Sequence, residues 1–288
     1  MFSPDLLAGR RVLITGGGTG LGRAIGERFL ALGASLVICG RRVAVLEQTA
    51  AEMLAAQPGA QVTTMGCDVR DPAAVEAMLD TIWQDRPLDI LVNNAAGNFL
   101  AQSHRLSVRA IDAVLGIVLH GSAYCTLGCG RRWIAAGRGG TVLSILTLSA
   151  LSGAAFTVPS AMAKAGVLAM TRSLAAEWGP KGIRCVAVAP GSFPTAGASA
   201  GLAPAALQKP PPARTIPLGR VGEYRELMDA CSFLVSDLAS YVNGECLVVD
   251  GGKQFLSGSA QNDTATLLGW SDEQWDALRP AKPARSEK

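Results

Sequence analysis

A glycine-rich turn between an apolar and an amphipathic segment constrains the fold more than any other feature of this sequence. The run Thr15-Gly16-Gly17-Gly18-Thr19-Gly20-Leu21-Gly22 follows the apolar residues 12–14 and precedes the helix-like segment 23–32. Its glycines depart from the usual G-x-G-x-x-G spacing but keep the order of strand, sharp turn and helix start. Such a turn lets a pyrophosphate approach the amides at the helix N-terminus. The alternative is a glycine-rich loop without a ligand.

Short apolar, β-branched runs alternate with longer helical patterns along the rest of the chain. Seven such runs predict strands, at residues 11–15, 35–39, 61–66, 89–93, 140–145, 183–189 and 246–249. They lack clean polar alternation, which is typical of strands covered by helices on both faces. The pattern predicts an α/β fold, with one doubly wound (Rossmann) domain over residues 1–288 and a seven-stranded parallel sheet between two helix layers.

Two segments interrupt this alternation. Residues 191–217, rich in Pro, Ala and Gly, follow the sixth predicted strand at the sheet edge where such folds bind ligands. A substrate lid is the prediction and a solvated loop is the alternative, because long loops in compact domains are often lids. Residues 254–288 form a C-terminal tail, in which Ser271-Asp272-Glu273-Gln274 has the pattern of a capping box that begins a short helix.

Charge and composition narrow the classes of partner. The 288 residues carry a net charge of +3 from scattered basic residues, so neither nucleic acid nor a membrane is the expected partner. No uninterrupted apolar run reaches the roughly 20 residues of a membrane span, and too few residues precede the first strand for a targeting peptide. The seven dispersed cysteines lack metal-site spacing and fit a reducing compartment. We expect a cytoplasmic protein without a metal site.

Four motifs together resemble the short-chain dehydrogenase/reductase superfamily. They are the glycine turn, Asn93-Asn94-Ala95-Ala96-Gly97, Ser160-Ala161-Met162-Ala163-Lys164 and Pro190-Gly191. Longer strings resemble the mitochondrial-type 2,4-dienoyl-CoA reductases, at residues 67–72 (CDVRDP), 93–99 (NNAAGNF), 158–166 (VPSAMAKAG), 173–179 (SLAAEWG) and 273–276 (EQWD). The resemblance implies NADPH-dependent reduction of 2,4-dienoyl-CoA, or a related enoyl-CoA, in unsaturated fatty acid degradation by a homotetramer.

The resemblance also implies a set of contacts to NADP(H). Besides turn residues 16–22, it includes Arg41, Asp68, Val69, Asn94, Ala95, Lys164, Pro190, Gly191, Ser192 and Phe193. Arg41 and Arg42 follow the second predicted strand, where an acidic residue would bind the ribose of NAD. Because two arginines at a helix start oppose its dipole, a bound 2′-phosphate explains them better than solvent does. A pair of surface arginines is the alternative.

The expected catalytic group is incomplete. In most of the superfamily a Tyr four residues before the Lys protonates the substrate, and a Ser thirteen residues before that Tyr orients it; these positions hold Ser160 and Thr147 here. The mitochondrial-type reductases place a Tyr at the position of Ser149, so that tyrosine is missing too. The three hydroxyls are candidate donors or water ligands, or else ordinary strand-end and helix-cap groups. His120, where the superfamily has an Asn that holds water, is either a proton relay or a packed helix residue.

Lys164 is the candidate that holds the nicotinamide ribose and places positive charge near a forming enolate. The missing tyrosine affects reduction of a conjugated thioester least, because hydrogen-bond donors can stabilise the thioester oxygen before water protonates carbon. For the acyl-CoA, Arg70 is the candidate phosphate contact, and Asn98 and Phe99 are expected at the acyl entrance. Two other functions stay open: a short-chain reductase of another carbonyl or imine, and a catalytically silent NADP-binding protein.

Overall fold

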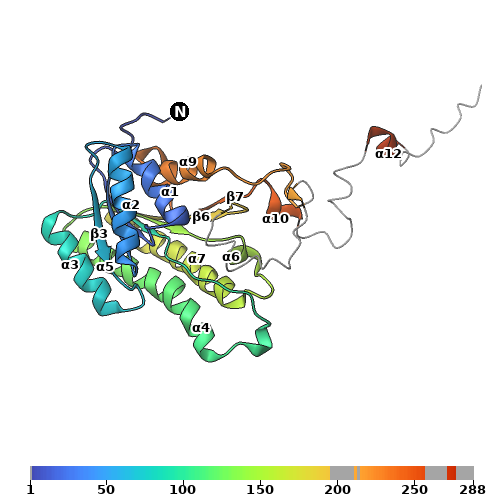
Figure 1. The fold of residues 1–288 in the computed structure, drawn as a ribbon, viewed down its shortest axis with the longest axis horizontal. Helices are drawn as coiled ribbons and strands as arrows, with labels where there is room; N and C mark the ends of the chain where they lie inside the picture. The colour runs from blue at the N-terminus through green and yellow to red at the C-terminus, as the bar shows by residue number, and fades with distance from the viewer. Residues whose placement is uncertain (1, 195–210, 213–214, 257–270, 277–288) are drawn as a thin grey trace, which may run out of the picture.

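The computed structural model describes residues 2–194, 211–212, 215–256 and 271–276, and these contain one parallel sheet (Figure 1). Its strands are β1 (Arg11–Thr15), β2 (Ser35–Gly40), β3 (Val62–Gly66), β4 (Ile90–Asn93), β5 (Gly140–Ile145), β6 (Ile183–Pro190) and β7 (Cys246–Val249). Their order in the sheet is β3-β2-β1-β4-β5-β6-β7. The predicted seven-stranded, doubly wound α/β fold is therefore confirmed, with each strand boundary within one residue of its prediction.

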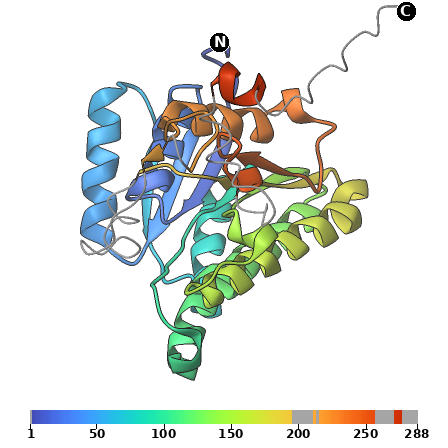
Figure 2. The same ribbon diagram turned by 90° about the vertical axis from the view of Figure 1, so that its right-hand side faces the viewer.

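Helices cover both faces of the sheet (Figures 1 and 2). The longer ones are α1 (Gly20–Leu30), α2 (Val43–Ala56), α3 (Pro72–Asp85), α4 (Val108–Leu115), α5 (Gly121–Ala135), α7 (Val158–Trp178) and α9 (Tyr224–Val235). The short ones are α6 (Ser149–Ser152), α10 (Lys253–Leu256), α12 (Asp272–Asp276), the 3-10 turns η1 (Ser103–Arg105), η3 (Gly179–Lys181) and η5 (Asp237–Ala239), and the π-helical η2 (Gly116–His120).

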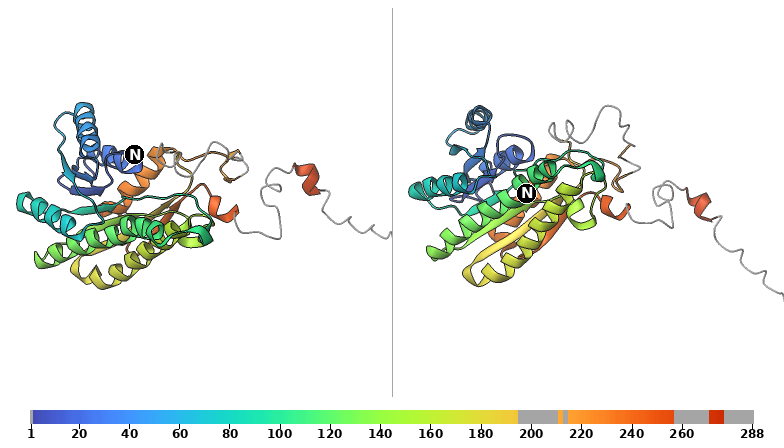
Figure 3. Two further views of the ribbon diagram at one scale, coloured as in Figure 1. Left: turned by 60° about the horizontal axis from the view of Figure 1, so that its bottom comes forward. Right: turned by 90° about the horizontal axis from the view of Figure 1, so that it is seen from below.

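The two largest hydrophobic cores lie between these layers. One joins α1, α2 and α9 to the sheet, and the other joins α3, α5 and α7 to the opposite face. In β1, Val12 and Ile14 belong to the first core and Leu13 to the second. This explains why the strands are apolar at consecutive positions. Figure 3 shows α5 and α7 as neighbouring green and yellow helices, and the ends of these two helices share the second core.

One continuous helix differs from the expectation about membrane spans. Residues Val108–Ala135, comprising α4, η2 and α5, are long and apolar enough to cross a membrane by length and composition alone. Within its most apolar stretch, 33% of the residues are buried in this structure. Cys125, Cys129 and Trp133 of this helix pack into the second core. Burial against the sheet therefore explains part of the apolar composition of this helix. A search for uninterrupted apolar runs does not detect that composition.

The two segments that interrupt the pattern are described only in part. Of the predicted lid, residues 195–210 and 213–214 lie outside the described residues, so the lid stays a prediction. Of the tail, α12 begins as the capping-box pattern predicts, because Ser271 N–H donates to Gln274 Oε1 at 2.9 Å and Gln274 N–H donates to Ser271 Oγ at 3.4 Å. The remaining tail residues, 257–270 and 277–288, lie outside the described residues.

A strained residue precedes α7. In the described part of the chain, Phe156 is the one non-glycine residue with a positive φ, at 62°, and its side chain is 58% exposed. Because a bulky residue loses about 1–2 kcal/mol in this conformation, we expect Phe156→Asn to raise the free energy of unfolding by about 1 kcal/mol. Urea denaturation measures the change. Phe255→Asn, at another exposed phenylalanine, is the control; an equal gain in both variants would contradict the strain argument.

Candidate functional site

The glycine turn connects β1 to α1 at the carboxyl edge of the sheet. Gly16 has a φ of +66°, and a Cβ on Gly22 would lie 2.4 Å from the Gly16 carbonyl oxygen and 2.4 Å from Asn94 Nδ2. Both positions therefore require glycine. Thr19, the N-cap of α1, makes no side-chain hydrogen bond to the first helical turn. The first amides of α1 are thus left for an anion, as a pyrophosphate site requires.

Hydrogen bonds fix this turn to the end of β4. Thr15 Oγ1 accepts from the backbone N–H groups of Asn94 and Ala95 at 3.0 Å each and donates to the Val92 carbonyl at 3.3 Å. Asn94 Nδ2 donates to the carbonyls of Thr15 at 2.9 Å and Gly16 at 3.2 Å. Thr15 was not among the predicted site residues, although a hydroxyl at the end of the first strand was the available signal. The two strand ends form one rigid frame.

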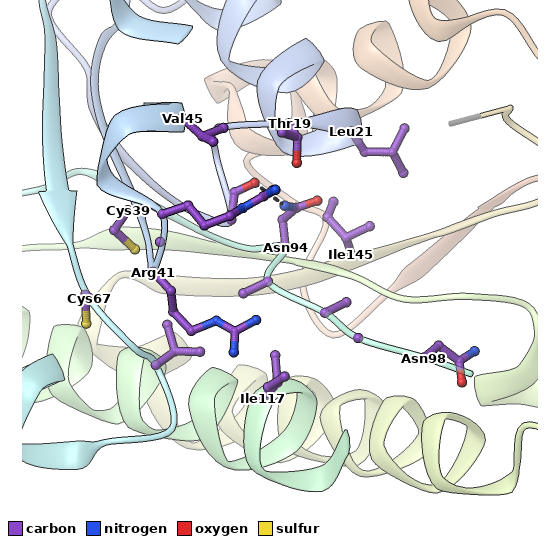
Figure 4. A pocket seen from close by; sticks show the side chains of 18 of the residues that line it. Thr19, Leu21, Cys39, Arg41, Val45, Cys67, Asn94, Asn98, Ile117 and Ile145 are labelled. Atoms are coloured by element: carbon purple, nitrogen blue, oxygen red, sulfur yellow. Dashed lines mark hydrogen bonds between the residues drawn. The ribbon is translucent and has the colours of Figure 1, made fainter. Parts of the chain in front are cut away.

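The turn opens into a cavity of about 560 Å³ (Figure 4). Most predicted cofactor contacts line it: Gly16, Gly18, Thr19, Leu21, Arg41, Arg42, Asp68, Val69, Asn94, Ala95, Lys164, Pro190, Gly191 and Phe193. Thr147 and Asn98 line it as well. Gly17, Gly20, Gly22 and Ser192 do not, and neither do Ser149, Ser160, His120, Arg70 and Phe99. Of the glycines outside the cavity lining, Gly17 packs against Ile38 and Gly22 against Gly16 and Asn94, whereas Gly20 is exposed.

Two arginines lie where β2 ends. Arg41 and Arg42 are exposed at the start of α2, whose first turn carries no acidic residue. Figure 4 shows Arg41 extended along the cavity. The nearby carboxylate of Asp68 is bound instead by Arg70, whose Nε donates to both its oxygens at 3.0 Å. This hydrogen bond lowers the pKa of Asp68. The arrangement leaves the Arg41 guanidinium available to a ligand.

Arg70 differs from its expected placement. It does not line the cavity, because its guanidinium is committed to Asp68. The pair is partly exposed, with side-chain exposures of 44% and 30%. The predicted contact of Arg70 with a CoA phosphate therefore requires exchange of one anion for another on the same guanidinium.

Two thiols in the cavity wall were missed by sequence reasoning. Cys39 at the end of β2 and Cys67 after β3 both line the cavity. Burial raises the pKa of Cys67 to about 11 and raises the pKa of Cys39 well above its ordinary value. All seven cysteines are buried and unpaired. Residue type alone gave no signal for this location.

Lys164 is the buried charge of the site. The residue is 5% exposed, lies on α7 and donates from Nζ to the Ile145 carbonyl at the end of β5. Burial lowers the pKa of Lys164 to about 8. No carboxylate forms an ion pair with it in the described ranges. The structure thus holds a positive charge at the cavity wall with little compensation.

The predicted hydroxyls are split between the cavity and its surroundings. Thr147 Oγ1 lies 2.6 Å from Ser149 Oγ, just after β5. Ser160 is buried on α7 outside the cavity. His120 ends the π-helical segment, is exposed, and has its ring centroid 6.2 Å from that of Tyr124. Because the structure does not place His120 in the cavity, its relay role stays a prediction.

The far end of the cavity is formed by loops after β4 and β6. Asn98 Oδ1 accepts from Phe99 N–H at 2.9 Å, and Phe99 packs against the cluster of Val114, Val118 and Ala163. Gly191 N–H donates to the Val249 carbonyl at 2.9 Å, and Lys253 Nζ donates to Ser192 Oγ at the same distance. Across the described segments, no group of three or more His, Cys, Asp or Glu side chains is placed to hold a metal ion.

The buried lysine predicts a pH profile. Since the ammonium is the low-pH form, activity that needs it is present below about pH 8 and is lost as pH rises through that value. We expect kcat/KM to fall about tenfold per pH unit at pH values well above this pKa. A profile measured in overlapping buffers checks this, and activity that stays constant up to pH 10 would contradict a required ammonium.

Comparison with known proteins identifies the family. The family model described as enoyl-(acyl carrier protein) reductase matches residues 16–254. The chain belongs to the short-chain dehydrogenase/reductase superfamily. An uncharacterized oxidoreductase of Caenorhabditis elegans is 43% identical over 95% of this chain and 88% of its own length. The peroxisomal 2,4-dienoyl-CoA reductase of Danio rerio, named as producing the (3E)-enoyl-CoA, is 37% identical over 93% of this chain and 88% of its own length.

Solved structures of short-chain dehydrogenases share the fold. One from Bacillus anthracis is 38% identical, with a TM-score of 0.76 over 85% of this chain and 96% of that chain. A putative 2-deoxy-D-gluconate 3-dehydrogenase from Agrobacterium tumefaciens, solved with bound NADP, is 34% identical with a TM-score of 0.77 over 87% of this chain and 98% of that chain. The predicted resemblance to this superfamily and to its 2,4-dienoyl-CoA reductases is confirmed. As a short-chain dehydrogenase/reductase, the protein is an oxidoreductase of a family that binds NAD(P) nucleotides.

Proposed function

We propose that the protein is an NADPH-dependent reductase of 2,4-dienoyl-CoA, or of a related enoyl-CoA, that acts in unsaturated fatty acid degradation. One observation carries the proposal. The cavity keeps the buried Lys164 and the Thr147 hydroxyl, while serines occupy both family positions for a catalytic tyrosine. A site without a phenol is poorly suited to protonate an alkoxide but can still stabilise an enolate.

The residues of the site suit this chemistry. When bound in the cavity, NADPH would supply the hydride that reduces the acyl chain of a conjugated thioester. Negative charge then builds on the thioester oxygen, where the Thr147 hydroxyl donates a hydrogen bond and the Lys164 ammonium contributes a positive potential. Water then protonates carbon. No step of this reaction requires a side chain with the acidity of tyrosine.

Preference for NADPH rests on Arg41 and Arg42. Both line the cavity at the end of β2, and no acidic residue occupies the first turn of α2 to bind ribose hydroxyls or repel a 2′-phosphate. The exposed guanidinium of Arg41 can offer a phosphate a charge-assisted, bidentate contact. The relative solved with bound NADP supports the same cofactor class.

The acyl-CoA is assigned to the end of the cavity near Asn98, with Phe99 behind it and Arg70 as the contact for a CoA phosphate. The similarity to the zebrafish dienoyl-CoA reductase supports this substrate class. For the assembly we propose a cytoplasmic homotetramer. The exposed apolar side chains Leu127 and Ile134 on α5 and Met162 on α7 support packing of these helices between subunits.

Turnover tests the proposal. We expect NADPH oxidation with 2,4-hexadienoyl-CoA and slower oxidation with crotonyl-CoA, followed by absorbance and confirmed by product analysis. Turnover of a ketone or imine, with none of dienoyl-CoA, would favour the alternative short-chain reductase. NADPH binding without turnover of any of these substrates would favour a catalytically silent NADP-binding protein, which the two missing tyrosines also permit.

A further inference from the structure

The hydroxyl pair after β5 is asymmetric. Thr147 lines the cavity together with Lys164, whereas Ser149, the first residue of α6, does not. Their Oγ atoms lie 2.6 Å apart, and either atom can be the donor. No other side-chain hydrogen bond of Thr147 or Ser149 is found in the described part of the chain. The two hydroxyls are therefore hydrogen-bonded to each other, and only Thr147 lines the cavity.

Each hydroxyl has a single proton, so the direction of the bond decides what Thr147 can do. If Thr147 donates to Ser149, its oxygen offers only lone pairs to the cavity. If Ser149 donates to Thr147, the Thr147 proton is left for a ligand acceptor. An oxygen that gains negative charge in the cavity selects the second direction, because it is a far better acceptor than a serine hydroxyl.

We propose that Ser149 is a positioning residue that donates to Thr147 Oγ1 and thereby directs the Thr147 hydroxyl toward the substrate oxygen. The inference rests on the proposed function and assigns the work of the missing tyrosine to two residues. Accepting a hydrogen bond strengthens the donation that a hydroxyl makes. Neither hydroxyl gives up its proton, so no net proton moves through the pair, and carbon is protonated by water.

Local backbone contacts hold the pair in place. The Thr147 carbonyl accepts from Ala150 N–H at 3.0 Å, and the Ser149 carbonyl accepts from Gly153 N–H at 3.0 Å. Ser152 lies on the same short helix, but its Oγ lies within hydrogen-bond distance of the carbonyls of Leu148, at 3.3 Å, and Gly153, at 3.0 Å, and not of the pair. Ser152→Ala thus removes a hydroxyl from α6 without touching the pair and serves as a matched control.

A double-mutant cycle on kcat tests the assignment. We expect Thr147→Val to lower kcat with 2,4-hexadienoyl-CoA about a hundredfold, the usual loss for one donor to an oxyanion. Ser149→Ala is expected to lower kcat about fivefold with little change in KM, and to have no effect once Thr147 is Val. Ser149→Thr, which keeps the hydroxyl, should restore most of the activity. Ser152→Ala should behave as the native protein.

Two results would overturn the assignment while the proposed function stands. One is an equal loss from Ser149→Ala in the native and Thr147→Val proteins. The other is a Ser149→Thr variant that is as impaired as Ser149→Ala. A purely structural role for Ser149 predicts the first result together with a lower melting temperature, which thermal unfolding of each variant measures.

A second measurement does not depend on turnover. Acetoacetyl-CoA ionises to an enolate with its own absorbance band, and it is titrated into the protein with NADP⁺ present. Native protein should raise the enolate fraction, and Thr147→Val and Ser149→Ala should each reduce it. The double variant should reduce the enolate fraction by less than the sum of the two single effects. Enolate binding with no dienoyl-CoA turnover would reject the proposed reaction but keep the hydroxyl assignment. No enolate binding by the native protein would overturn the assignment.

Discussion

Replacing Lys164 by methionine is expected to lower kcat/KM at least about a hundredfold while making the folded protein more stable. The loss follows from removing the positive charge beside the developing oxyanion, a contribution of about 10²–10³ in comparable sites. The gain follows from burial. Methionine keeps the length of the side chain but carries no charge to desolvate. NADPH oxidation with 2,4-hexadienoyl-CoA and urea denaturation measure the two effects on the same preparation.

The stability gain depends on pH in a defined direction. The folded-state pKa of Lys164, about 8, lies below the ordinary value of 10.5, so folding disfavours the ammonium. This cost is present in full below pH 8, where it amounts to roughly 3 kcal/mol, and it is relieved as pH rises from 8 toward 10.5. The advantage of Lys164→Met should therefore shrink over that range. A variant that is both inactive and less stable at pH 7 would show that the lysine supports the fold instead.

Arg41→Ala is expected to weaken NADPH binding by about 10- to 100-fold, the value of one charge-assisted contact to phosphate. NADH lacks the 2′-phosphate, so its affinity should change less than about threefold. Fluorescence titration of both nucleotides measures the ratio directly. The same variant should leave kcat with saturating NADPH nearly unchanged, because Arg41 follows β2 while Lys164 contacts the end of β5, with β1 and β4 between these strands.

Arg109→Ala is the matched control, because it removes an equal charge from an exposed position on α4 that does not line the cavity. It should leave the NADPH-to-NADH ratio as in the native protein. Equal losses for both nucleotides in Arg41→Ala would instead assign the arginine to the shared pyrophosphate or adenine. Arg42→Ala then separates the two neighbouring arginines.

The fold could be predicted because its signals are local. The apolar runs that become β1, β5 and β7 have the predicted bounds. Nearly every residue of β1 and β5 is buried, which favours consecutive apolar residues in these two strands. The helix Val108–Ala135 was harder to interpret. Polar residues interrupt its apolar runs, but the mean hydropathy of its most apolar stretch is still high enough for a membrane span.

The site could be predicted less completely, because contacts between distant segments decide it. The glycine turn and Lys164 have local motifs, and Lys164 lines the cavity together with Gly16, Gly18, Thr19 and Leu21 of the turn. The ion pair with Asp68 keeps Arg70 out of the cavity lining, and no sequence pattern predicts that Arg70 binds Asp68. Thr15 and the thiols of Cys39 and Cys67 become part of the site only when neighbouring strands end at the same edge.

Those two thiols make the nucleotide site open to chemical footprinting. A protonated thiol reacts slowly with alkylating reagents, and both are buried in the cavity wall. Alkylation of Cys39 or Cys67 in the native protein is therefore expected to be slow and to depend on local opening of the cavity wall. A nucleotide that closes the cavity slows this labelling. The alkylation rate at each thiol thus reports the opening free energy of the cofactor site without a spectroscopic label or a turnover assay.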